Sequence, residues 1–106
     1  MIALSIRQPF AEQILRGTKK IEYRSIPTRI RGRVYIYASK KDRKDIYEEM
    51  GEDPGTFPTG VIVGIVEIKD CLKNRKDYHW HLAHPARFTR KMKPKKRPQP
   101  VWFWPF

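Results

Sequence analysis

The change from helix to strand falls within the stretch Gly17-Thr18-Lys19-Lys20-Ile21-Glu22-Tyr23-Arg24, which has the form G-x-K-x-x-E-x-R. A glycine in that place can end a helix in the left-handed conformation, because it has no Cβ. In a strand over 20–24, Lys20, Glu22 and Arg24 would point to one face and the residues between them to the other. The pattern predicts a carboxylate held among cations, which suits a site for an anionic ligand that forms hydrogen bonds.

The residues around this stretch predict further short elements. Residues 2–6 are expected to form a strand, and Pro9 suits the first turn of a helix that Gly17 closes. A third strand is expected over 33–39, because it alternates and is rich in β-forming residues. Ser39 is then expected to cap a second helix over about 41–50.

The second half of the chain is expected to be mostly strands. Residues 61–71 are apolar on both faces, which is typical of a central strand, with Val63 and Val66 on opposite faces. Gly64 interrupts this run and indicates a bulge or a tight bend. Short strands are also expected over 78–82 and 101–106, the latter at a sheet edge because of its prolines.

Composition bounds the function. The net charge is +12 in 106 residues, and the five Phe, five Tyr and three Trp argue against disorder. A nucleic acid is the leading partner for such a charge, because Lys and Arg release counterions from phosphates. An anionic membrane surface is the second candidate and solubility alone the third. No apolar run approaches the roughly 18 residues that span a bilayer, so we expect no membrane partner.

The elements together predict an α+β protein. We expect a single domain over residues 1–106, with about six short strands in a curved sheet or a partly closed barrel, and two small helices. Cys71 is the only cysteine, which excludes an intrachain disulfide and weakly favours a reducing, cytoplasmic location. It is expected to be a buried small hydrophobe. The oligomeric state stays open, with a monomer slightly favoured.

Several motifs in order resemble the ASCH domain (activating signal cointegrator homology), a family of the PUA-like superfamily. They are Leu4-Ser5-Ile6-Arg7-Gln8-Pro9-Phe10-Ala11, the stretch 17–24, Arg31-Gly32-Arg33-Val34-Tyr35-Ile36, and the segment from Phe57 to Val66 followed by Asp70-Cys71. The resemblance covers nearly the whole chain. It departs at Lys95-Lys96-Arg97, where the family pattern would place a turn with glycine.

The resemblance implies a small PUA-like β-barrel with flanking helices and a cleft that binds RNA or another nucleic acid. Carried over by position, it implicates Lys19, Glu22 and Arg24, with Ser5 and Gln8 nearby. The expected contacts with the nucleic acid combine these positions with cations from the basic stretches of the chain. They are Ser5, Arg7, Gln8, Lys19, Lys20, Arg24, Arg31, Arg33, Arg90, Lys93, Lys95, Lys96 and Arg97. One basic run contains no acidic residue and is expected to follow phosphates as a surface patch: Arg87, Arg90, Lys91, Lys93, Lys95, Lys96 and Arg97. A second patch could consist of Arg7, Arg29, Arg31 and Arg33.

Two alternatives stay open. One group that resembles ASCH proteins hydrolyses acylated cytidines with a lysine at the position of Lys19 and a threonine where this chain has Glu22, and ribonuclease activity has been attributed to family members. A nucleoside amidohydrolase or a weak ribonuclease would use Lys19 and Glu22, although the missing hydroxyl does not support the former. The other alternative is an adaptor whose basic face binds an acidic protein.

The histidines and tryptophans have less specific readings. His79 and His81 share a strand face, but a metal site needs three or four converging ligands, so we expect no metal and no cofactor. Stacking on a nucleotide or a phosphate contact is favoured for them. Trp80 is assigned to the core. Trp102 and Trp104 lie on one face of the last strand, where packing is favoured over a base-stacking platform.

Overall fold

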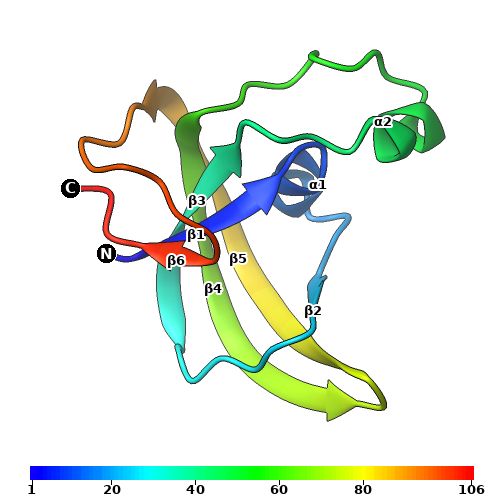
Figure 1. The fold of residues 1–106 in the computed structure, drawn as a ribbon, viewed down its shortest axis with the longest axis vertical. Helices are drawn as coiled ribbons and strands as arrows, with labels where there is room; N and C mark the ends of the chain where they lie inside the picture. Colours follow the sequence, from blue (N-terminus) through cyan, green and yellow to red (C-terminus); the bar gives the residue numbers. More distant parts are fainter.

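A computed structural model describes residues 1–106. Six strands and two helices follow one another along the chain (Figure 1): β1 Ala3–Arg7, α1 Phe10–Arg16, β2 Ile21–Arg24, β3 Gly32–Ser39, α2 Lys44–Met50, β4 Val61–Asn74, β5 Asp77–Met92 and β6 Trp102–Phe103. None of the helices is long and apolar enough to span a membrane.

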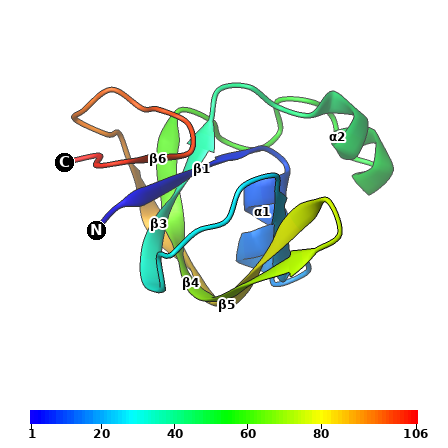
Figure 2. The ribbon, with the colours of Figure 1, turned by 60° about the horizontal axis from the view of Figure 1, so that its bottom comes forward.

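All six strands belong to one sheet in the order β2-β5-β4-β3-β1-β6. β1 and β3 are parallel, and every other neighbouring pair is antiparallel. The sheet curls into a half-barrel with α1 on its concave side, and α2 stands apart at one end (Figure 2). The predicted α+β class, the strand number and the barrel-like curvature are therefore confirmed.

The core fills the concave side of the sheet. Leu4, Ile14, Ile36, Val66 and Trp80 belong to a cluster of twelve buried residues, each almost fully removed from water. Burial of side chains of this size is the main favourable contribution to folding. The predicted core position of Trp80 and the central position of β4, between β5 and β3, are confirmed.

Gly64 lies at an irregularity in the pairing of β4 with both β3 and β5. This confirms the bulge or bend that the glycine predicted. The register shifts between Ile62 and Gly64 opposite β5. A Cβ at Gly64 would overlap the carbonyl oxygen of Ala86 and come within 2.7 Å of Leu15 Cδ2, so only glycine permits this approach. The irregularity also corrects one expectation, because Val63 and Val66 are buried in the same cluster and not on opposite faces.

Other boundaries differ from those expected. β4 runs to Asn74 and β5 to Met92, because these two strands pair along most of their length as a hairpin. The last strand is only Trp102–Phe103, since the prolines around it cannot donate to a ladder. Cys71 is half-buried and not fully buried.

The expected cap of the second helix is wrong. α2 begins at Lys44 after Arg43, which is extended, and Ser39 is the last residue of β3. Ser39 Oγ donates to the carbonyl oxygen of Lys41 at 3.2 Å, while the amide of Arg43 donates to the carbonyl oxygen of Gln8 at 2.8 Å. These contacts hold residues 40–43 as a non-helical connection, which the local helical pattern did not reveal.

β2 and β6 are the two edge strands of the sheet and do not pair with each other. The gap between the two edges is therefore bridged by side chains. Trp80 on β5 stacks on Trp102 on β6, with ring centroids 5.6 Å apart and planes 8° from parallel. Arg24 Nη2 on β2 donates to the carbonyl oxygen of Ser5 on β1 at 2.9 Å. We call the side where β2 faces β1 and β6 the seam.

Candidate nucleic-acid cleft

A cavity of about 710 Å³ opens along the seam and continues past the end of β3. Its lining combines six cationic side chains with one carboxylate. The lining residues are Ser5, Arg7, Phe10, Glu22, Arg24, Tyr37, Ser39, Lys40, Lys41, Arg43, Arg97, Pro98, Gln99 and Pro100. We call this cavity the cleft.

Glu22 is the one carboxylate of the cleft, and its side chain is almost completely buried. Arg24 Nε donates to Glu22 Oε2 at 2.9 Å, and Lys19 Nζ lies 3.4 Å from Glu22 Oε1. Glu22 pairs with Trp80 in the β2–β5 register, which turns its side chain to the concave side of the sheet. The predicted convergence of an ammonium, a carboxylate and a guanidinium is therefore present.

Lys19 contacts Glu22 but is not among the residues that line the cleft. Gly17 ends α1 in the left-handed conformation with φ 80°, as predicted, and the amides of Thr18 and Lys19 both donate to the carbonyl oxygen of Gln13. The Lys19 ammonium then lies 4.9 Å from the ring centroid of Phe10 and 5.0 Å from that of Tyr23. Two aromatic rings and one carboxylate thus hold this ammonium in place.

The cleft also contains cations that no acidic residue neutralises. Arg7, Lys40, Lys41 and Arg97 take part in no ion pair, whereas Arg43 donates through two nitrogens to Asp45 at 2.9 and 2.7 Å. Unpaired cations around a concave surface attract anions and raise their local concentration.

The C-terminal segment forms one wall of the cleft. Ser5 Oγ donates to the carbonyl oxygen of Gln99 at 2.8 Å, and the amide of Ser5 donates to that of Val101 at 2.9 Å. These bonds fix residues 97–100 beside β1, so Arg97 faces the cleft. Tyr37 also lines the cleft, its ring packs edge-on against Phe103 with centroids 5.2 Å apart, and burial raises the pKa of its phenol.

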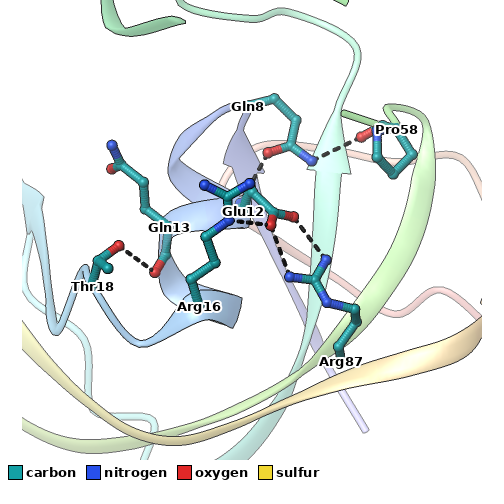
Figure 3. A network of polar contacts seen from close by, with 7 residues as sticks. All are labelled: Gln8, Glu12, Gln13, Arg16, Thr18, Pro58 and Arg87. Carbon is teal, nitrogen blue, oxygen red and sulfur yellow. Dashed lines mark hydrogen bonds and ion pairs between the residues drawn. The ribbon is translucent and has the colours of Figure 1, made fainter. Parts of the chain in front are cut away.

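A polar network surrounds the buried Glu12 on α1 (Figure 3). Glu12 is 5% exposed and accepts hydrogen bonds from Arg87 at 2.7 and 2.8 Å and from Arg16 at 2.7 Å. Burial opposes the charge of this carboxylate and is the largest influence, but the bonds from Arg87 and Arg16 together lower the pKa of Glu12. The expectation that Arg87 belongs to a free basic surface is therefore wrong.

Gln8 belongs to this network and not to the lining of the cleft. Its side-chain oxygen accepts from the amide of Glu12 at 3.0 Å, and its side-chain nitrogen donates to the carbonyl oxygen of Pro58 at 2.9 Å. Both groups are therefore used within the protein, and Gln8 is 1% exposed. Its role is to attach the start of α1 to the loop before β4.

The structure places the other expected contact residues outside the cleft. Lys20 lines a separate cavity of about 270 Å³ near the middle of β5, and Arg31 lies 3.5 Å from Asp70. Arg33 and Arg90 are exposed on strands, and Lys93, Lys95 and Lys96 precede the wall at 97–100. The expected set therefore divides into three groups. Ser5, Arg7, Arg24 and Arg97 line the cleft, Gln8 and Lys19 are bonded within the protein, and the other cations lie elsewhere on the surface.

Sequence reasoning missed Lys40, Lys41 and Arg43. Their run of basic residues was visible, but it was assigned to the start of a helix, where it would have faced solvent. The histidines have local partners: His79 packs edge-on against Tyr23 and lies 3.2 Å from Asn74 Nδ2, and His84 Nδ1 lies 3.0 Å from Glu67.

The family model described as the ASCH domain matches residues 4–101. The chain belongs to this family. The match includes β1, the stretch 17–24 and the wall at 97–100, so the ASCH domain extends through the region where the expected turn with glycine is missing.

Individual proteins are also similar to this chain in sequence or in structure. The human protein "Activating signal cointegrator 1" is 35% identical over 85 residues, and its mouse counterpart is 34% identical. Each match covers 69% of this chain and 15% of the relative, so the chain corresponds to a small part of those proteins. The crystal structure of ASCH from Zymomonas mobilis superposes with a TM-score of 0.67 at 15% identity, covering 97% of this chain and 85% of that one. This last likeness shows that the fold is shared.

Proposed function

We propose that this ASCH domain binds RNA or another single-stranded nucleic acid in the cleft. The observation that carries the proposal is the set of four unpaired cations around one cavity that also contains a buried carboxylate. The cations at the mouth would contact phosphates and supply affinity, and the inner groups would contact a base and supply selectivity.

The charge supports a phosphate ligand. Arg7, Lys40 and Lys41 lie on or just beyond strand ends, and Arg97 belongs to the C-terminal segment; all four line the same cleft. An anion in the cleft is therefore attracted by several cations at once. The net charge of +12 extends this attraction beyond the cleft.

The size of the cleft supports a nucleotide that is not part of a duplex. A volume of about 710 Å³ falls within the range of roughly 300 to 1,000 Å³ that is usual for small-ligand sites. A base can enter such a cavity only when it is unstacked, as in single strands, loops and ends. A regular duplex could contact only the mouth.

A binding titration tests the proposal. A fluorescein-labelled single-stranded RNA of mixed sequence is titrated with the protein at several salt concentrations, and its anisotropy is measured. We expect binding that weakens steeply with salt, and the double variant Lys40→Gln/Lys41→Gln to bind at least tenfold more weakly. The matched control is Lys76→Gln, in the turn between β4 and β5 away from the cleft. No binding at low salt, or equal loss in both variants, would refute the proposal.

A further inference from the structure

We infer that the cleft selects guanine among the four bases and that Glu22 is the residue that reads it. This inference rests on the proposed function, because it names which base of a single-stranded nucleic acid enters the cavity. It follows from three observations: a single carboxylate in the lining, the contacts that fix it, and the kinds of groups that surround it.

The carboxylate of Glu22 is a fixed acceptor with unused capacity. Arg24 approaches Oε2 through two nitrogens, Nε at 2.9 Å and Nη2 at 2.7 Å, whereas Lys19 Nζ approaches Oε1 at 3.4 Å, a long contact for a hydrogen bond. A carboxylate accepts hydrogen bonds and donates none. A carboxylate offers about four lone-pair sites, so sites remain for a ligand, mainly on Oε1. Because Arg24 is itself bonded to Ser5, the orientation of the carboxylate is set before a ligand arrives.

An ionised carboxylate discriminates between bases by their donors. Guanine has two adjacent donors on its Watson–Crick edge, N1–H and the 2-amino group, and these match the two oxygens of a carboxylate. Adenine and cytosine place an acceptor nitrogen beside their amino group, and uracil places its one N–H between two carbonyls. A buried carboxylate would meet a lone pair in each of those three bases, which is unfavourable.

The rest of the lining suits the remaining groups of guanine. Glu22 is the one acidic group of the cleft, and the lining also contains six cationic side chains. These can donate to the O6 and N7 acceptors, a pairing that arginine and lysine commonly make with guanine. The ring of Phe10 gives the cavity an apolar surface against which a base can pack.

The test uses hexamers of uridine in which one internal position is guanosine, inosine, adenosine or cytidine, each labelled identically. All the hexamers carry the same charge, so phosphate contacts cancel in the comparison. Inosine keeps N1–H but lacks the 2-amino group. We expect the guanosine hexamer to bind about 10- to 100-fold more tightly than the inosine hexamer, the range for a hydrogen bond to a charged group.

Two variants separate the selectivity for a base from the electrostatic affinity for phosphates. Glu22→Gln replaces one acceptor by a donor and removes a negative charge, so we expect all four hexamers to bind with nearly equal affinity. Arg7→Gln should weaken all four alike and keep the ratio of guanosine to inosine. Thermal unfolding checks that each variant is folded. If Glu22→Gln does not fold, the comparison of guanosine with inosine on the wild-type protein remains decisive.

The outcomes distinguish this inference from the proposed function. Salt-sensitive binding of the hexamers with equal affinity for guanosine and inosine would overturn the choice of guanine and leave the proposed function standing. A preference for adenosine or cytidine would do the same. No binding of any hexamer at low salt would overturn both.

Discussion

Arg24 Nη2 donates to the carbonyl oxygen of Ser5 at 2.9 Å while its Nε donates to Glu22, so one guanidinium connects β2 to β1 across the seam. The guanidinium carbon also lies 5.4 Å from the ring centroid of Trp80. The same group therefore holds the two sides of the half-barrel together and orients the carboxylate of the cleft. Arg24 therefore serves stability and, under the proposed function, also the recognition of the ligand.

Arg24→Gln should lower the free energy of unfolding by about 2 to 3 kcal/mol, because it leaves the largely buried Glu22 without its main partner. Urea denaturation monitored by circular dichroism measures the change. Arg33→Gln is a matched control, since Arg33 is exposed on β3 and should change stability by less than about 0.5 kcal/mol. Equal stability of the two variants would contradict the role assigned to Arg24.

Glu12→Gln should destabilise the protein at neutral pH by about 2 kcal/mol, because Arg16 and Arg87 lose a buried charged acceptor. The pKa of Glu12 is lowered in the folded state, so its contribution is present above the ordinary glutamate range and is lost as pH falls through the folded value. The difference between wild type and variant should therefore shrink below about pH 4. Urea midpoints across pH measure this, and a difference independent of pH would disagree with the network.

Gly64→Ala should destabilise the fold more than Gly17→Ala does. The added methyl group at Gly64 meets the backbone of Ala86, which belongs to a strand and cannot move aside, so we expect a loss of about 2 to 3 kcal/mol. At Gly17 an added methyl group meets no other atom, so the loss of stability is only that of placing alanine in the left-handed conformation, about 1 kcal/mol. Thermal unfolding of both variants gives the order, and the reverse order would show that the close approach at Gly64 is not real.

Arg97→Gln should reduce the salt dependence of nucleic-acid binding. Each phosphate contact removed lowers the slope of log K against log salt by about 0.7 for a single strand. Arg97 lies on the cleft wall, whereas Lys76 lies in the turn after β4, so Lys76→Gln should leave the slope unchanged. Anisotropy titrations at four or more salt concentrations supply both slopes. A slope that is insensitive to Arg97 would place the phosphates elsewhere on the surface.

The parts that were predictable from the sequence rest on local patterns. The left-handed end of α1 at Gly17 follows from the residue itself, and the place of β4 follows from its apolar faces. The wall of the cleft was not predictable, because it depends on a hydrogen bond between Ser5 and Gln99, which are 94 positions apart. The same holds for Glu12 and Arg87, whose pairing joins a helix to a distant strand.

Residues 40–43 show a different source of error. Their composition and the serine before them are typical of a helix start, yet the chain is not helical here, because the amide of Arg43 donates to the carbonyl oxygen of Gln8. A tertiary contact thus overrides a local preference. Its effect on the site is large, since it turns Lys40 and Lys41 toward the cleft.

The stacked pair of Trp80 and Trp102 gives the protein an intrinsic optical reporter. The two indoles belong to opposite sides of the seam, so any widening separates the rings and alters their fluorescence, while Trp104 is 61% exposed and emits as a constant background. Ligand entry, partial melting and loss of the C-terminal strand could therefore each be followed on the unlabelled molecule. A Trp104→Phe variant would isolate that signal.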